Sequence, residues 1–179
     1  MKRRPSSAAA ISGPESADTP SSEAAVPSAR DKPRARVLAL DLEATLISSA
    51  VSQFPRPGLF EFLVRCRELF PRVVMFTTVR EQLLRDIAGT LVDERAAPEW
   101  FRELEYVHWT GTTKDLSFIP GCPVGEALLV DDLAAYVHPG QQAQWVQAEP
   151  FEPPFDGSDT GLTKVLEKLE ERVSPGAVS

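Results

Sequence analysis

The chain has 179 residues, of which 42% are hydrophobic and 25% are charged, with a formal net charge of −7. These values are typical of one globular domain with its own core, and no apolar stretch approaches the roughly 20 residues that span a bilayer. The acidic balance disfavours binding to a nucleic-acid backbone and favours a metal cation or a partner with basic segments.

The first 34 residues differ from the rest of the chain in composition. Residues 1–34 hold seven Ser and five Pro and carry a net positive charge, whereas the remaining residues are strongly acidic. Such a segment buries too little apolar surface to offset the entropy lost on ordering it. We therefore expect a disordered tail over 1–34, a domain over 35–173 and a short disordered end over 174–179.

The cysteine count and the N-terminal sequence indicate the compartment. Cys66 and Cys122 are the only cysteines, which argues against a disulfide framework and against a zinc site. The basic residues Lys2–Arg4 precede only a short apolar run, Ala8–Ile11, which is too short for a secretory signal. We therefore expect a cytoplasmic protein.

The first half of the domain predicts a strand, a helix and a second strand. The unbroken apolar run Val37–Leu40 is typical of a strand buried on both faces of a parallel sheet. Apolar residues at helical spacing from Leu59 to Phe70 predict a helix, and Pro57 suits its start. Arg72–Phe76 is the second strand, and the crossover between the two strands is expected to be right-handed.

The second half continues this alternation. Apolar residues at helical spacing predict a helix over residues 83–92, with Leu83 on its apolar face. Further strands are expected over Leu104–Trp109, Ala127–Val130 and Ala143–Gln147. A last amphipathic helix has an apolar face that runs from Leu162 to Leu169. The pattern predicts an α/β domain with a parallel sheet.

Polar side chains follow three of these strands where each one ends. The three clusters are Asp41, Glu43 and Thr45; Thr77 and Thr78; and Asp131 and Asp132. Because ligands of open α/β sheets bind at the carboxyl ends of the strands, we expect the clusters to meet in one crevice. In an extended chain Asp41, Glu43 and Thr45 point the same way, and they can supply a nucleophile, an acid or base and a hydrogen-bond donor.

Five stretches in this order carry a family likeness. They are Val37–Ile47 (VLALDLEATLI), Arg56–Phe62 (RPGLFEF), Val73–Thr78 (VVMFTT), Lys114–Ser117 (KDLS) and Ala127–Asp132 (ALLVDD). On them the sequence resembles the haloacid-dehalogenase-like (HAD) phosphohydrolases, and more narrowly the NLI-interacting-factor-like, RNA-polymerase-C-terminal-domain-type phosphatases. The likeness covers roughly residues 36–172 and implies a Rossmann-like, doubly wound parallel sheet.

The resemblance implies a catalytic or substrate-binding role for five residues. Asp41 would attack phosphorus and form an aspartyl-phosphate, which splits a difficult hydrolysis into two steps. Thr77 would hydrogen-bond the transferred phosphoryl group, and Lys114 would hold the charge of that group and of Asp41. Thr45 and Thr78 complete the expected substrate-binding set.

The resemblance also implies a Mg²⁺ site. Asp41 and Asp131 would bind the ion together with the backbone carbonyl of Glu43, and Asp132 would share the ion or support its ligands. Mg²⁺ suits hard carboxylate oxygens combined with several waters and a phosphate.

One residue departs from the family pattern, which is usually Asp-x-Asp-x-Thr, because the second acid here is Glu43. In the family that position is the general acid for the leaving oxygen and then the base that activates water. Glu has the same chemistry with one more methylene, and a misplacement of about an ångström can cost ~10² in rate. We expect a slow or specialised phosphatase.

Short connections predict the substrate class. Only 31 residues separate Thr45 from Thr77, and a loop, a helix and a strand use them all, so we expect no cap domain over the site. An open crevice admits a phosphorylated side chain of a protein, whereas small substrates usually need enclosure. The expected substrate is a phosphoprotein carrying phospho-Ser or phospho-Thr, or another exposed phosphomonoester, with no nucleic-acid or membrane partner.

Two alternatives stay open. A catalytically silent domain of this fold would bind a phosphorylated or basic partner, with Glu43 as the inactivating change. A small-metabolite phosphatase of the same superfamily would act equally on sugar phosphates and phosphopeptides. His108 and His138 have no ligand-spaced companions, so we expect them to be structural or exposed.

Overall fold

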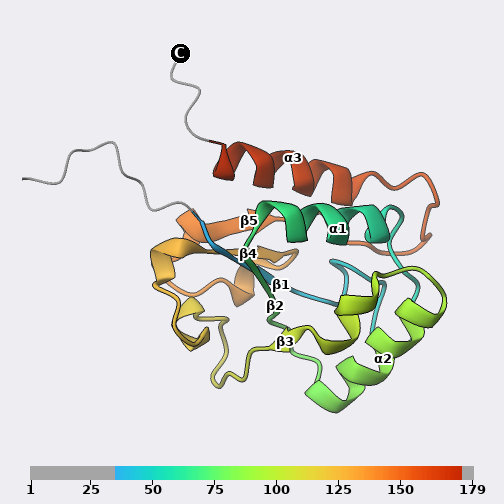
Figure 1. Cartoon of the computed structure of the whole chain (residues 1–179), viewed down its shortest axis with the longest axis horizontal. Helices are drawn as coiled ribbons and strands as arrows, with labels where there is room; N and C mark the ends of the chain where they lie inside the picture. The colour runs from blue at the N-terminus through green and yellow to red at the C-terminus, as the bar shows by residue number, and fades with distance from the viewer. Residues whose placement is uncertain (1–34, 175–179) are drawn as a thin grey trace, which may run out of the picture. The chain divides into compact units, whose positions relative to one another are not determined.

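The computed structural model describes residues 35–174 (Figure 1). The tails expected over 1–34 and 174–179 lie outside the described residues, apart from Ser174. Five strands form one parallel sheet in the order β3-β2-β1-β4-β5. The strands are β1 (Val37–Leu40), β2 (Arg72–Met75), β3 (Glu105–Tyr106), β4 (Ala127–Asp131) and β5 (Trp145–Gln147).

The register of the central strand determines where the strands end. Leu40 of β1 pairs with Met75 of β2 on one side and with Val130 of β4 on the other. The residues that follow these three positions therefore leave the sheet at the same edge. This register explains why the polar clusters that follow β1, β2 and β4 lie at one edge of the sheet, as expected from the sequence.

All three α-helices pack on one face of the sheet. They are α1 (Leu59–Leu69), α2 (Glu81–Asp93) and α3 (Gly161–Val173), and α1 and α3 lie side by side (Figure 1). Their buried residues share one core cluster with Leu38 and Leu40 of β1. This cluster is the larger of the two cores in the described part of the chain.

The opposite face of the sheet is covered by the chain between β3 and β4. Ala39 of β1 and Leu129 of β4 share a second core cluster with Leu116 and Ile119 from this connection. The connection contains only short 3-10 turns, at Leu116–Phe118 and at Val124–Glu126. The segment that carries Lys114 therefore approaches the sheet on the face that the α-helices leave free.

The predicted α/β fold with a Rossmann-like, all-parallel sheet and no cap is confirmed. Between β1 and β2 the chain forms only a loop and α1, and between β2 and β3 it forms α2 and a 3-10 turn at Glu99–Glu103. Among the helices of residues 35–174, none has the length and apolar character needed to cross a bilayer.

Three details differ from the predicted elements. The third strand ends at Tyr106, after which the indole of Trp109 turns back and donates to the Thr77 carbonyl at 2.9 Å. The strand expected from Ala143 begins at Trp145, because the residues before it form a 3-10 turn. Leu83 is exposed rather than on the buried face of α2.

Two glycines provide a test of this description. Gly58 precedes α1 with a φ of 77°, in the left-handed region that costs an L-residue about 1–2 kcal/mol, whereas Gly89 lies inside α2. A Cβ at Gly89 would meet only Arg102 Nη1, at an ordinary 3.6 Å. We predict that Gly58→Ala lowers the free energy of unfolding by about 1 kcal/mol and that Gly89→Ala raises it by up to about 1 kcal/mol.

Urea unfolding of both variants checks this prediction. Equal effects of the two substitutions would contradict the assigned start of α1.

Candidate active site

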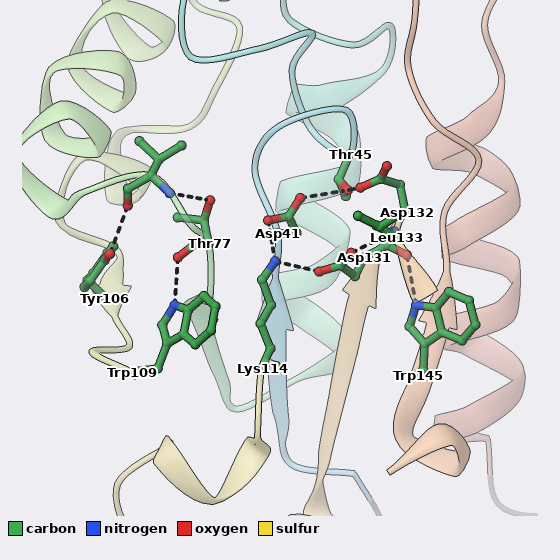
Figure 2. A network of polar contacts seen from close by, with 11 residues as sticks. Asp41, Thr45, Thr77, Tyr106, Trp109, Lys114, Asp131, Asp132, Leu133 and Trp145 are labelled. Atoms are coloured by element: carbon green, nitrogen blue, oxygen red, sulfur yellow. Dashed lines mark hydrogen bonds and ion pairs between the residues drawn. The ribbon is translucent and has the colours of Figure 1, made fainter. Parts of the chain in front are cut away.

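Three carboxylates meet where β1 and β4 end. Asp41 follows β1, Asp131 is the last residue of β4, and Asp132 comes next. Each offers an oxygen to a group of potential metal ligands that all lie within 4.8 Å of one another (Figure 2). Asp41 and Asp131 are buried, and Asp132 is half-buried. The register between the two strands brings these acids together.

Lys114 lies between two of these carboxylates. Its Nζ donates to Asp41 Oδ1 at 2.5 Å and to Asp131 Oδ2 at 2.5 Å, and its side chain is fully buried (Figure 2). The Lys114 backbone N–H donates to the carbonyl of Tyr136 at 2.7 Å, and the Tyr136 ring lies 5.1 Å from Nζ. The backbone of Lys114 is thus fixed by a hydrogen bond, and its ammonium group is held by two carboxylates and an aromatic face.

Thr45 connects the first carboxylate to the third. Its buried hydroxyl faces Asp41 Oδ2 at 3.2 Å and Asp132 Oδ1 at 3.3 Å. Asp131 is oriented separately, because its Oδ1 accepts the Leu133 N–H at 2.8 Å. Each carboxylate of the cluster therefore has a defined orientation.

The cluster holds more negative than positive charge. Burial raises the pKa of Asp41 to about 6; Lys114 lowers this pKa and Asp131 raises it. Burial and the neighbouring Asp131 also raise the pKa of Asp132. Three carboxylates face one lysine in a mostly buried site, so a divalent cation would relieve the repulsion between them. The donor set fits Mg²⁺, which prefers hard carboxylate oxygens.

Thr77 and Thr78 follow β2, which lies on the other side of β1 from β4. Figure 2 shows Thr77 across β1 from the two adjacent aspartates. The Thr77 hydroxyl is buried and accepts the Val79 N–H at 3.2 Å, while Thr78 is exposed. Thr77 is thus at the expected edge, with its hydroxyl directed to its own turn.

Glu43 lies outside the group of carboxylates that forms the cluster. Its Oε1 accepts the backbone N–H of Ala50 at 2.8 Å, and the residue is half-buried. The longer side chain of Glu43 thus binds the loop that follows Ile47. The sequence gives no signal for this contact.

Several supporting residues were not identified as functional from the sequence. The indole of Trp145 donates to the Asp131 carbonyl at 2.9 Å, and the indole of Trp109 donates to the Thr77 carbonyl at 2.9 Å, so two tryptophans hold the backbone at strand ends. Arg56 is a buried cation behind the Asp41 loop. It lies in a stretch that carries the family likeness, but burial of an arginine leaves no pattern in a single sequence.

The two histidines lie away from the acidic cluster. His108 is exposed and lies 3.3 Å from Glu81, and the His138 ring is hydrogen-bonded to Thr113. These positions agree with structural or exposed roles.

The fold and the site define a class of protein, the capless phosphatases of the HAD type, with an acidic motif at the carboxyl edge of a parallel sheet. A model of the NLI interacting factor-like phosphatase family matches residues 36–178, and the chain belongs to this family. Among curated proteins no match to the chain is found.

The raised pKa of Asp41 predicts how stability depends on pH. Without metal, the folded protein holds the Asp41 proton up to about pH 6, whereas an unfolded chain releases it near 3.8, so the contribution to stability is lost as pH rises through this window. Asp41→Asn removes this loss. We predict that the free energy of unfolding of the variant rises relative to that of the wild type between pH 4 and pH 7. The change is on the order of 3 kcal/mol, at about 1.4 kcal/mol per pKa unit.

Urea unfolding of both proteins in a chelator, across that range, measures the difference. A difference that does not change with pH would show that burial of Asp41 does not perturb its titration.

Proposed function

We propose that the chain is a Mg²⁺-dependent phosphomonoester hydrolase that works through an aspartyl-phosphate on Asp41, with a phosphoprotein as its substrate. One observation carries the proposal: the Lys114 ammonium lies 2.5 Å from both Asp41 and Asp131. A nucleophilic carboxylate with a cation beside it, next to further acidic ligands, is an arrangement suited to phosphoryl transfer.

In the first step an oxygen of Asp41 bonds to phosphorus, and the bond to the leaving oxygen breaks. Lys114 supports this step because its ammonium is already fixed beside Asp41 and can hold the charge of the phosphoryl oxygens. Thr45 orients the nucleophile through the hydroxyl that faces Asp41 Oδ2. Thr77 and Thr78 complete the proposed phosphate-binding set at the end of β2.

Mg²⁺, held by Asp41, Asp131 and Asp132 with the Glu43 carbonyl, would supply charge neutralisation and orientation of the phosphate. The excess of carboxylates over lysine in the cluster supports this assignment. The raised pKa values of Asp41 and Asp132 are consistent with it, because burial and the neighbouring Asp131 disfavour the ionised form of both carboxylates and a bound cation would favour it.

Glu43 is the proposed acid and base. It would give a proton to the leaving oxygen, then take one from the water that attacks phosphorus and releases phosphate from Asp41. Its Oε1 accepts the Ala50 N–H at 2.8 Å, and the residue lies outside the acidic cluster. This placement supports a slow enzyme, since the carboxylate must approach the leaving oxygen before it can act.

The substrate and the setting are part of the proposal. The absence of a cap between β1 and β3 supports an exposed phosphate group on a protein. Cys66 and Cys122 are both free thiols, which supports a reducing cytoplasmic setting.

A second candidate is a silent domain that binds a phosphorylated partner. The hydrogen bond between Glu43 and Ala50 favours it, because it holds the acid outside the acidic cluster.

Turnover of an aryl phosphate tests the proposed enzyme. We predict activity that a chelator abolishes, that Mg²⁺ restores, and that Asp41→Asn reduces to background. Asp86→Asn, on the exposed surface of α2, is the matched control and should retain wild-type activity.

Phosphopeptides and sugar phosphates at equal concentration then separate the substrate classes. A higher kcat/KM on phosphopeptides supports a protein phosphatase, and equal values support a metabolite phosphatase. If the wild type and Asp41→Asn are equally inactive while the protein binds a phosphopeptide, the silent domain is correct.

The role of Glu43 is tested by a variant that keeps its hydrogen bond. The amide oxygen of Glu43→Gln can still accept the Ala50 N–H, but the amide cannot transfer a proton. We predict an unchanged Tm and a kcat lowered by about 10²–10⁴. The loss should be larger for an alkyl phosphate than for a nitrophenyl phosphate, because the poorer leaving group needs the proton more. Equal losses on the two substrates would exclude Glu43 as the acid.

A further inference from the structure

A buried arginine lies behind the loop that carries Asp41 and Thr45. The Arg56 side chain has 0% exposure, although arginine is almost never fully buried without partners. Its Nε donates to Asp159 Oδ1 at 2.7 Å and its Nη2 donates to Asp159 Oδ2 at 3.1 Å, a two-pronged pairing. Asp159 comes just before α3, so Arg56 connects the start of α1 to the start of the last helix.

The remaining nitrogen of Arg56 reaches the loop that carries Asp41 and Thr45, here called the catalytic loop. Its Nη1 donates to the Thr45 carbonyl at 3.2 Å and to the Glu149 carbonyl at 2.8 Å. The Thr45 hydroxyl is the group that faces both Asp41 and Asp132. The guanidinium therefore holds the backbone of the residue whose side chain connects the two carboxylates.

The neighbouring residue of the loop is bound from the same direction. The Phe151 N–H donates to the Ala44 carbonyl at 2.7 Å, and the Phe151 ring lies 5.4 Å from the Arg56 guanidinium. Ala44 has a φ of 54°, which an L-residue adopts at a cost of about 1–2 kcal/mol. A loop with such a residue keeps its shape only when other contacts impose it.

Gly161, the first residue of α3, leaves the space that the guanidinium occupies. A Cβ at this position would lie 1.8 Å from Arg56 Nη2 and 2.4 Å from Cζ. Glycine is otherwise a poor helix residue, costing roughly 1 kcal/mol against alanine. The close approach of Arg56 is a physical reason for glycine here.

We propose that Arg56, Asp159 and Gly161, the arginine clamp, position the Thr45 hydroxyl for the reaction from a distance. Arg56 is in this account a positioning residue, because it touches the loop and not the reacting atoms. The inference rests on the proposed phosphatase activity. It implies that substitutions at the start of α3 change kcat, although these residues do not touch the reacting atoms.

The direct test compares two glycine variants. Gly161→Ala displaces the guanidinium while Arg56 and Asp159 keep their chemistry, whereas a Cβ at Gly157 meets nothing within 4 Å and Gly157→Ala is the matched control. We predict that Gly161→Ala lowers kcat on an aryl phosphate about 10–100-fold and that Gly157→Ala stays within twofold of wild type. A kcat within twofold of wild type for both variants overturns the proposal.

A general loss of stability must be separated from loss of positioning. Leu169→Ala removes a fully buried side chain on the far part of α3 and should lower Tm without lowering kcat at a temperature where the variant is folded. Arg56→Lys keeps the positive charge but cannot make the two-pronged pairing with Asp159, and its kcat should fall below that of the wild type. Equal loss of kcat in Leu169→Ala, or full activity in Arg56→Lys, contradicts the clamp.

Hydrogen exchange gives a readout that needs no activity. The Leu46 and Ile47 amides both donate to the Leu42 carbonyl inside the catalytic loop. We predict that Gly161→Ala lowers their protection at least tenfold relative to core strand amides, while Leu169→Ala lowers both sets together.

If the wild type lacks Asp41-dependent turnover but the two amides respond as predicted, the proposed function fails and the clamp stands. Unchanged relative protection in Gly161→Ala overturns the clamp itself.

Discussion

The structure depends on one buried ion pair network, in which the Lys114 ammonium lies between Asp41 and Asp131. Burying an ion costs several kcal/mol unless close partners compensate, so the two carboxylates and the lysine must be brought together accurately. The parallel register of β1 and β4 aligns the acids, and the helix-free face of the sheet admits the segment that carries the lysine. The fold thus brings the charges of Asp41, Asp131 and Lys114 together at the carboxyl edge of the sheet.

The same network favours function at the expense of stability. Asp41 is buried with only part of the positive charge that it needs, which raises its pKa and disfavours its ionised form without metal. Thr45 and the arginine clamp fix the geometry around it from the other side. An aspartate held in this way is oriented for the proposed attack on phosphorus, and the surrounding contacts supply the free energy that keeps it buried there.

The sequence predicted the features that depend on neighbours along the chain. Unbroken apolar runs identified β1 and β4, and the acids that follow them were placed at one edge because parallel strands end together. The role suggested for Lys114 came from family likeness, and the structure brings that residue to the predicted acids. The positions of Asp41, Asp131 and Lys114 next to one another were thus predictable, whereas their proposed roles stay predictions.

Features that depend on distant partners were not predictable. The burial of Arg56 requires Asp159, more than a hundred residues away, and the space left by Gly161. The short β3 and the hydrogen bond from Ala50 to Glu43 likewise reflect competing tertiary contacts rather than local preference. For Arg56 and Glu43 the hydrogen-bond partner depends on the tertiary fold, and residue spacing along the sequence does not identify it.

A structure of the protein with Mg²⁺ and beryllium fluoride, a mimic of a bound phosphoryl group, would show which residue accepts the phosphoryl group. We predict beryllium bonded to an Asp41 oxygen, Lys114 against its fluorides, and the metal on Asp41 and Asp131. An adduct at another residue, or a metal bound without Asp41 and Asp131, would contradict it.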